Sequence, residues 1–181
     1  MLLMMSAMVI AGCAVTLPAG DEFNAAMLER VAGEEALLFV YSMPDNQKAY
    51  YKYILIDGVH QSTITNETFA RLVVSPGKHT VRISQHGWKN RVEMPKIFGE
   101  LRNEEILALI DGKKDIEVAP SSVHFVAIHM KGRTIYYECG ESATATQVCS
   151  KDVEGVVIEE PSRETAVLML SSLREVCDEC E

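Results

Sequence analysis

Short β-rich stretches separated by turn signals recur along this chain from residue 36 onward, and they limit its possible folds more than any other feature. Each stretch is either apolar throughout or alternates between apolar and polar residues, which is typical of strands. We expect strands over residues 36–43, 49–56, 68–74, 79–84, 104–110, 115–118, 122–130 and 133–139. Because no helical pattern intervenes, they predict a mainly β protein, an antiparallel sandwich of about seven or more short strands, rather than a parallel α/β sheet.

Two turn motifs indicate how these strands are connected. Asp57-Gly58 closes the strand 49–56, and both residues tolerate the positive φ angles of a tight hairpin turn. We expect strand 49–56 to pair with 36–43. Ser75-Pro76-Gly77-Lys78 matches a type II turn, because Pro fixes φ at the first central position and Gly accepts a positive φ at the second. The strand 79–84 is therefore expected to return along 68–74.

Two other segments have helical patterns. Residues 21–32 place Phe23, Met27 and Val31 at helical spacing ahead of Gly33, which predicts a short N-terminal helix. An amphipathic C-terminal helix is expected to begin at Pro161, whose missing N–H is tolerated in a first turn. Its apolar stripe should cover one face or edge of the sheet. The residues of this stripe are Ala166, Met169, Leu170, Leu173 and Cys177.

Residues 1–12 carry no charge and are almost wholly apolar, but a helix needs about 20 residues to cross a bilayer. Polar and turn-forming residues follow between Thr16 and Asp21, so the run fits the apolar part of an export signal better than a buried helix. The run ends in Ile10-Ala11-Gly12-Cys13, which resembles the lipobox of bacterial lipoproteins. The resemblance implies cleavage after Gly12 and a diacylglycerol on Cys13 that anchors the chain to a membrane.

The lipobox resemblance also implies an organisation and a location. Residues 1–12 are then the signal peptide, 13–35 a lipid-anchored tether with the short helix, and 36–181 the β-sandwich domain with its C-terminal helix. Ala14 is similar to the residues that direct lipoproteins to the outer membrane, facing the periplasm. The membrane is thus one expected partner, and an envelope protein or glycan is another. The formal charge of −9 argues against a nucleic-acid partner.

Residues 37–84 resemble a domain of small bacterial lipoproteins known as domain of unknown function 2846. The similarity lies in an apolar strand ending at Tyr41, in Ile56-Asp57-Gly58-Val59, and in Phe69 and Val74 leading into Ser75-Pro76-Gly77-Lys78-His79. This resemblance supports a β fold. Because the family has no known activity, it implies no functional residue.

The chain has five cysteines, of which four remain once Cys13 is lipidated. In an oxidising periplasm these four are disulfide candidates. They are Cys139, Cys149, Cys177 and Cys180. We expect Cys139 to bridge Cys149 across a stretch rich in Gly, Ser and Thr, and Cys177 to bridge Cys180. The alternative is that the two C-terminal cysteines reach the 139–149 hairpin instead.

Cys177 and Cys180 also have the Cys-x-x-Cys spacing of thiol oxidoreductases, so a periplasmic redox enzyme is an alternative function. Such pairs lie at a helix N-terminus, where the dipole stabilises thiolate, whereas this pair ends the expected helix among acidic residues. A hydrolase built on unrecognised His and Asp residues is the other enzymatic alternative. The chain has no recognisable motif for catalysis, for a metal or for a cofactor, and its five histidines are scattered.

The remaining candidate is an aromatic ligand surface. Tyr51 and Tyr53 alternate with Tyr50 and Lys52 on one expected strand, so Tyr51 and Tyr53 share a face. High β-propensity explains the same residues without a ligand. We therefore expect a lipid-anchored envelope protein that binds or supports other components without catalysis. An exposed apolar patch or edge strand would identify its partner surface.

Overall fold

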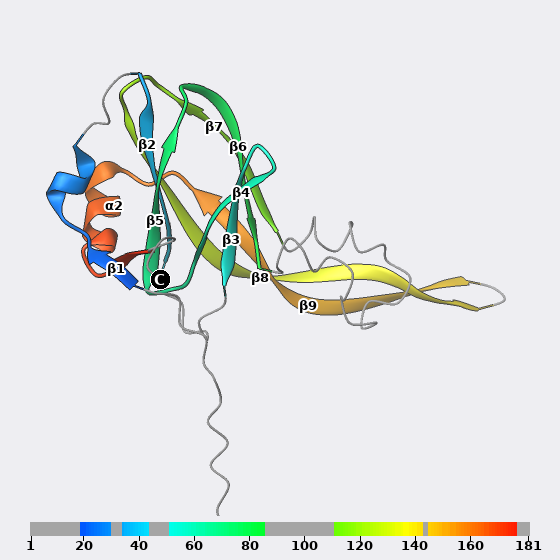
Figure 1. The fold of residues 1–181 in the computed structure, drawn as a ribbon. Helices are drawn as coiled ribbons and strands as arrows, with labels where there is room; N and C mark the ends of the chain where they lie inside the picture. The colour runs from blue at the N-terminus through cyan, green and yellow to red at the C-terminus, as the bar shows by residue number, and fades with distance from the viewer. Residues whose placement is uncertain (1–18, 30–33, 44–50, 86–110, 143–144, 177–181) are drawn as a thin grey trace, which may run out of the picture.

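The computed structural model describes residues 19–29, 34–43, 51–85, 111–142 and 145–176. For residues 19, 133, 135–142, 145–149, 151 and 153 it describes the backbone alone. Within these ranges the protein consists of two β-sheets, with one α-helix and one 3-10 turn packed against the larger sheet (Figure 1). The expectation of a mainly β protein is confirmed.

The larger sheet has six described strands in the order β1–β10–β5–β2–β8–β9. Their bounds are β1 Ala19–Glu22, β2 Ala36–Ser42, β5 Thr68–Val74, β8 Val123–Ser142, β9 Ala145–Glu159 and β10 Arg174–Val176. The pairs β2–β8 and β10–β5 are parallel, and the other three are antiparallel. A purely antiparallel arrangement is therefore wrong for this sheet. The chain passes through the smaller sheet between β2 and β8, so β8 can run in the same direction as β2.

The smaller sheet has four described strands in the order β4–β3–β6–β7, and all its pairs are antiparallel. Their bounds are β3 Lys52–Ile56, β4 Val59–Ile64, β6 Gly77–Ser84 and β7 Gly112–Val118. The predicted hairpin turn is confirmed, since Asp57 (φ 52°) and Gly58 (φ 83°) connect β3 to β4. Sequence analysis missed β4, because polar residues dominate it and only Ser62 and Ile64 are buried.

The two strand pairings expected from the turns are wrong. β2 lies between β5 and β8 in the larger sheet, whereas β3 belongs to the smaller sheet. At Gly77 (φ 131°) the chain crosses from β5 in one sheet to β6 in the other instead of forming a hairpin. All seven residues of β2 are buried, so this strand needs cover on both faces, and a central place in the larger sheet supplies it.

A hydrophobic core fills the space between the facing sides of the two sheets. The larger sheet contributes Leu38, Val40 and Val126 to this core, and the smaller sheet contributes Ile54 and Val81. Each of these side chains is fully buried. Burying a side chain of this size contributes about 1.5–3 kcal/mol, so this shared core holds the two sheets together.

A second core covers the opposite face of the larger sheet. Three phenylalanines from neighbouring strands, Phe39, Phe69 and Phe125, form its floor, and Phe23 meets the first two edge-on at 6.1 and 5.9 Å. The 3-10 turn η1 (Ala25–Leu28) and the helix α2 (Arg163–Leu170) lie over it. Their covering side chains are Met27, Ala166 and Leu170.

The expected N-terminal helix over residues 21–32 is absent from its described part. Residues 19–22 form β1 instead, which pairs with β10 at the edge of the larger sheet and so belongs to the folded domain. The Asn24 side chain accepts a hydrogen bond from the Ala26 N–H and begins the single turn η1. Phe23 and Met27 therefore both lie in the second core, with the single turn η1 in place of the expected α-helix.

The C-terminal helix is present but shorter than expected. Ser162 is its N-cap, so Pro161 lies just before the cap, and the last helical residue is Leu170. Its expected stripe does face the sheet, since Ala166 and Leu170 are fully buried and Leu173 packs in the turn that follows. The chain then continues as β10, and Cys177 lies outside the described residues.

Candidate functional site

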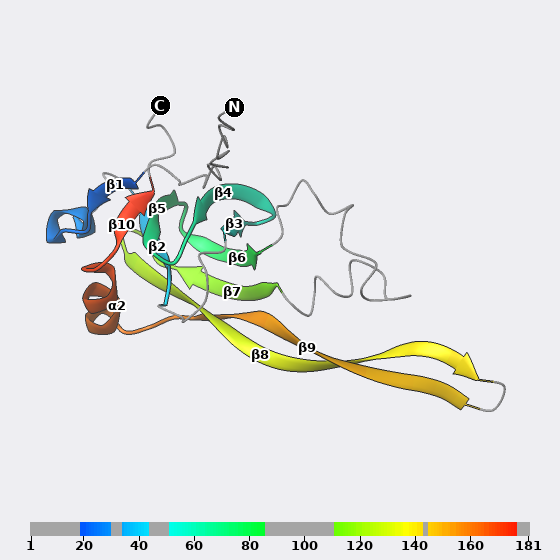
Figure 2. The same ribbon diagram turned by 90° about the horizontal axis from the view of Figure 1, so that it is seen from below.

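Strands β8 and β9 extend well beyond the rest of the fold as a two-stranded ribbon (Figures 1 and 2). We define the ribbon as residues 132–142 of β8 and 145–154 of β9. Its register begins at Gly132 opposite Glu154 and ends at Ser142 opposite Ala145. At about 3.4 Å per residue, the ribbon projects roughly 35 Å, which makes it the most prominent feature of the described surface.

Sequence analysis did not anticipate this ribbon. It predicts two strands, 122–130 and 133–139, where the structure has the single strand β8, which runs through Gly132. A Cβ at Gly132 would meet nothing within 4 Å, so the glycine lies in a regular, open part of the strand. β9 was missed because residues 145–154 are mostly polar and show no apolar alternation in the sequence.

Within the described residues, neither outer edge of the ribbon has a partner strand. β8 pairs with β2 only over Val123–Ile128, and beyond that point its partner is β9. β9 is the last strand of the larger sheet. The ribbon residues whose exposure the structure describes are all exposed. They are Gly132, Thr134, Ser150, Asp152 and Glu154. Such edges present unpaired N–H and C=O groups to which another chain can add a strand.

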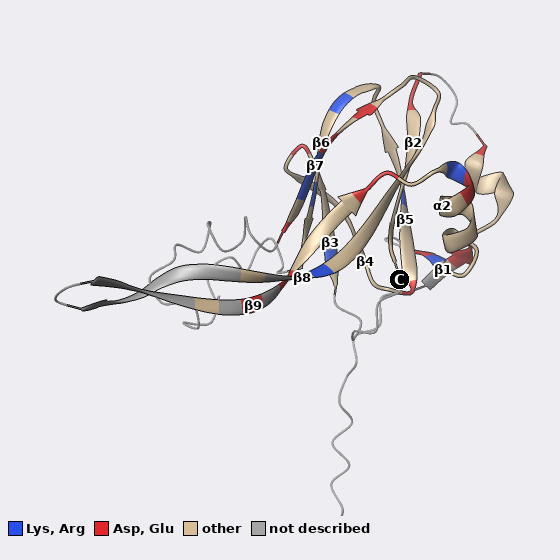
Figure 3. Cartoon of the chain, turned by 180° about the vertical axis from the view of Figure 1, so that it is seen from behind, with Lys and Arg blue, Asp and Glu red and all other residues tan. Residues whose placement is uncertain are grey.

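The base of the ribbon is acidic on the β9 side, where Figure 3 shows Asp and Glu residues along the strand. Asp152 and Glu154 are exposed there, and Glu159 is exposed at the end of β9 within the folded body. Asp152 accepts a hydrogen bond from the Thr134 hydroxyl at 2.7 Å, which ties the two strands together. Lys151 is the single cation of β9 in the sequence. The position of these charges restricts how another strand could pair with β9.

The structure brings two of the candidate cysteines onto one hairpin. Cys149 lies opposite Tyr137, and Cys139 lies at a bulge between Glu138 and Gly140, whose partners are Val148 and Gln147. The two cysteines are thus near each other in register but not directly opposite. Their side chains are outside what the structure describes, as are Cys13, Cys177 and Cys180 altogether, so the disulfide pairings stay predictions.

The structure changes one premise about Cys177 and Cys180. Sequence analysis placed them at the end of a helix, but the helix ends at Leu170 and the strand β10 leads up to Cys177. The dipole of helix α2 therefore gives no ground for judging the reactivity of these cysteines, which lie outside the described residues. The acidic neighbours remain, and they disfavour thiolate at either position.

The tyrosines expected to form an aromatic ligand surface are only partly exposed where the structure describes them. Tyr53 is half-buried and lies 6.1 Å from the ring of His60 on β4, ring centre to ring centre. Tyr51 is also half-buried and precedes β3. Tyr50 lies outside the described residues. The arrangement gives one aromatic residue packed across a strand pair, which is ordinary β-sheet packing.

Lys52, next to these tyrosines, is a buried cation that sequence analysis did not single out. Its side chain is 1% exposed and its Nζ donates a hydrogen bond to the Asn66 Oδ1. The Ser42 hydroxyl donates to the same oxygen at 3.1 Å. Alternation along β3 could have revealed it, since Lys52 precedes Ile54 by two residues on the core-facing side.

Two of the turn motifs meet in the structure. The Asp57 carboxylate lies 2.7 Å from His79 Nδ1 and accepts the Thr80 N–H at 2.8 Å. His79 Nε2 lies 2.8 Å from the Ser75 carbonyl, so the ring faces two acceptors. The hydrogen bond to Asp57 is the main reason that the pKa of His79 is raised, and the Thr80 N–H lowers the pKa of Asp57 most. We call this arrangement the Asp57–His79 clasp, and it joins the β3–β4 turn to β6.

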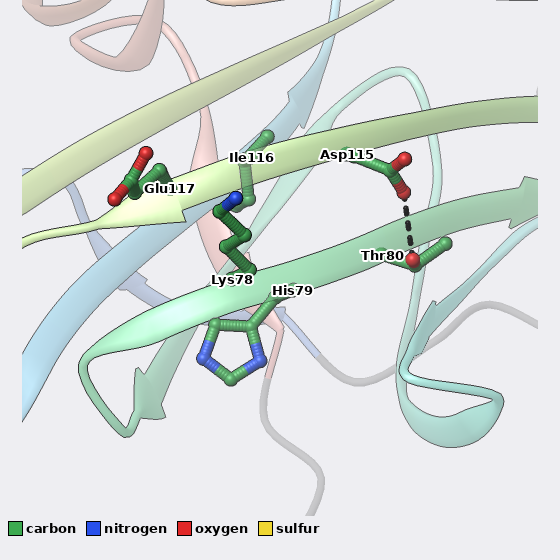
Figure 4. A pocket seen from close by; sticks show the side chains of 6 residues that line it. All are labelled: Lys78, His79, Thr80, Asp115, Ile116 and Glu117. Atoms are coloured by element: carbon green, nitrogen blue, oxygen red, sulfur yellow. Dashed lines mark hydrogen bonds between the residues drawn. The ribbon is translucent and has the colours of Figure 1, made fainter.

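A shallow pocket of about 440 Å³ lies over β6 and β7 beside the clasp (Figure 4). Its lining residues are Lys78, His79, Thr80, Asp115, Ile116 and Glu117. Thr80 donates a hydrogen bond to Asp115 at 2.7 Å, and Lys78 lies opposite Glu117 in the register. Because its polar side chains already face complementary groups across the strands, we assign no ligand to this pocket.

The other histidines that the structure describes lie apart from one another. His60 contacts Thr63, His124 faces the Ala119 N–H, and His129 pairs with Glu159 at 3.0 Å. In the parts of the chain that the structure describes, no three His, Cys, Asp or Glu residues are placed to hold a metal ion. No described helix is both long enough and apolar enough to span a bilayer.

Comparisons with known proteins add no relative: no family model matches this chain, and neither a curated protein nor a solved structure matches it. The lipobox and the similarity to domain of unknown function 2846 are therefore predictions that rest on the residues quoted for them.

Proposed function

We propose that this protein is a lipid-anchored component of the bacterial cell envelope that acts by binding another component and has no catalytic activity. Cys13 holds it at the membrane through diacylglycerol, and this membrane is the outer membrane on its periplasmic side. The finer fold proposal is a β-sandwich module, and the shared core between the two sheets supports it. The ribbon is the observation that carries the binding role.

The topology supports a division between an anchored edge and a binding edge. β1 begins at Ala19, six residues after Cys13 (19 − 13), and it is one outer strand of the larger sheet. Residues 14–18 can span at most about 18 Å, so a lipid on Cys13 keeps the β1 edge near the bilayer. β9 is the opposite outer strand of the same sheet, and the ribbon grows from it.

The ribbon supports a protein partner more than a small molecule. A two-stranded hairpin by itself is at best marginally stable in water, and this one continues past the core that stabilises its base. Exposed backbone edges attract strands, whereas ligand sites are concave and partly apolar. An envelope protein that adds a strand to the ribbon is thus the partner class favoured over a glycan.

The alternative function is thiol redox chemistry by Cys177 and Cys180. It is supported by their spacing alone. Titrating the thiols of the native, unreduced protein separates the two proposals. Two reactive thiols of low pKa near the C-terminus would favour the redox enzyme, and unreactive, bridged cysteines would remove it.

A photo-reactive amino acid at position 154 tests the binding role in intact bacteria. Glu154 is exposed on the ribbon, and Lys113 is exposed on β7 and serves as the control position. We expect discrete cross-linked products from position 154 and none from position 113. Cys13→Ala should diminish these products, because the unanchored chain is no longer concentrated at the membrane. Equal cross-linking from both positions, or none from position 154, would contradict the proposal.

A further inference from the structure

We infer that the partner of the ribbon is a second copy of this chain, which pairs antiparallel along β9 with Ser150 at the two-fold axis. This inference rests on the proposed binding role of the ribbon and names its partner. It concerns residues 145–155, where β9 has an outer edge with no described partner strand.

The β9 edge is better suited to this pairing than the β8 edge. The register of the ribbon shifts between Glu138 and Gly140, so β8 carries one extra residue, Cys139, and its alternation reverses there. β9 has no extra residue between Ala145 and Glu159. A partner strand can therefore follow β9 without a break, whereas it would lose register along β8.

Symmetry and charge together select the register. In a continuous antiparallel sheet, directly opposed residues have their side chains on the same face. When the two strands are identical, one residue of β9 must therefore lie opposite its own copy, at the two-fold axis. Centring the pair on Lys151, Asp152 or Glu154 places identical charges directly opposite each other. Centring it on Val153 places Asp152 opposite Glu154. Like charges in directly opposed positions are destabilising, which excludes these four registers.

Ser150 is the centre that gives the longest pairing over residues 145–155 and leaves no like charges opposed. It places Lys151 opposite Cys149, Asp152 opposite Val148, and Glu154 opposite Thr146 of the second copy. Pairing then continues to Ala145 opposite Gly155. Centres nearer the tip give shorter pairing, because β9 begins at Ala145. In this arrangement the two folded bodies lie at opposite ends of the paired strands.

The decisive variant is Ser150→Lys in the full-length protein, extracted from membranes in detergent. Ser150 is exposed and lies opposite Tyr136 on β8, so the change leaves the hairpin itself intact while placing two cations face to face in the dimer. Gln61→Lys, an exposed position on β4, an outer strand of the smaller sheet, is the matched control. Ser150→Asp repeats the test with the opposite charge.

Sedimentation velocity should show two polypeptides per particle for the wild type and for Gln61→Lys, and one for both Ser150 variants, with unchanged circular dichroism. In addition, Ser150→Cys should form an intermolecular disulfide on mild oxidation, and Asp152→Cys should not. A monomeric wild type, or dimers that survive both Ser150 variants, would overturn the inference. If position 154 cross-links to a different protein only, the binding role stands and the self-pairing fails; if it cross-links to nothing, both fail.

Discussion

Replacing Gly112 with alanine tests how closely the two sheets approach each other at β7 and β9. A Cβ at this position would lie 2.6 Å from Val156 Cγ1, 3.0 Å from Ile158 Cγ1 and 3.1 Å from Val156 Cβ. Both neighbours belong to the core between the sheets, so they cannot move aside freely. The glycine is thus explained by a close approach between the edges of the two sheets.

The expected cost follows from two opposing effects. A Gly→Ala change at an unstrained site stabilises by about 0.4–1 kcal/mol through the unfolded state. Overpacking a rigid core costs about 1–3 kcal/mol, so we expect Gly112→Ala to lower the free energy of unfolding by about 1–2 kcal/mol. For a chain of this size that lowers Tm by about 2–8 °C.

Gly132→Ala is the matched control, because a Cβ there would meet nothing within 4 Å. Thermal unfolding followed by circular dichroism should show the Gly132 variant unchanged or slightly more stable. In a Val156→Ala background the cost of Gly112→Ala should shrink, since the nearest clashing atom is gone. If Gly112→Ala is as stable as Gly132→Ala, the sheets are not in contact at this edge and the reasoning is refuted.

Two further predictions concern the clasp and the helix. The pKa of His79 is raised, so the stability that His79 contributes is full below its usual pKa of 6.5 and is lost as pH rises through the raised pKa. The pKa of Asp57 is lowered, so the stability that Asp57 contributes is present above its usual pKa of 3.8 and is lost as pH falls through the lowered pKa. Denaturant unfolding at pH 6 and pH 9 should therefore show a loss of stability at pH 9 that His79→Gln reduces, and an equal loss in that variant would remove the clasp as its cause. Leu170→Ala should lower the free energy of unfolding by about 2–5 kcal/mol, because Leu170 of α2 is fully buried in the second core. Leu168 is 70% exposed on the same helix, so Leu168→Ala should change the free energy of unfolding by no more than about 0.5 kcal/mol. Equal effects of the two changes in urea titrations would mean that α2 is not packed as described.

The sequence predicted individual strands well where local chemistry decides them. Thr68–Val74 was predicted with both bounds as observed, and the Asp57-Gly58 turn forms the expected hairpin. Which strands would pair was not predictable, because the same apolar pattern in β2 fits either sheet. Only the need to cover both of its faces places β2 at the centre of the larger one.

The candidate site was the harder part to predict. A ribbon that leaves the core buries little apolar surface, so β9 has no apolar alternation between residues 145 and 154 to reveal it. The clasp could have been suspected from its two turns, but nothing in their sequence indicates that Asp57 reaches His79 across the sheet. The cysteine and lipobox predictions involve residues or side chains outside those that the structure describes.

Mass spectrometry of the intact protein, extracted from a bacterial membrane fraction, tests lipid anchoring most directly, with Cys13→Ala as its comparison. We expect a wild-type mass that lacks residues 1–12 and carries the added mass of a diacylglycerol, with or without a third acyl chain. The Cys13→Ala variant should retain residues 1–12 and carry no lipid. A wild-type protein that keeps residues 1–12 without any acyl group would contradict the anchor, and with it the envelope location on which the proposed function depends.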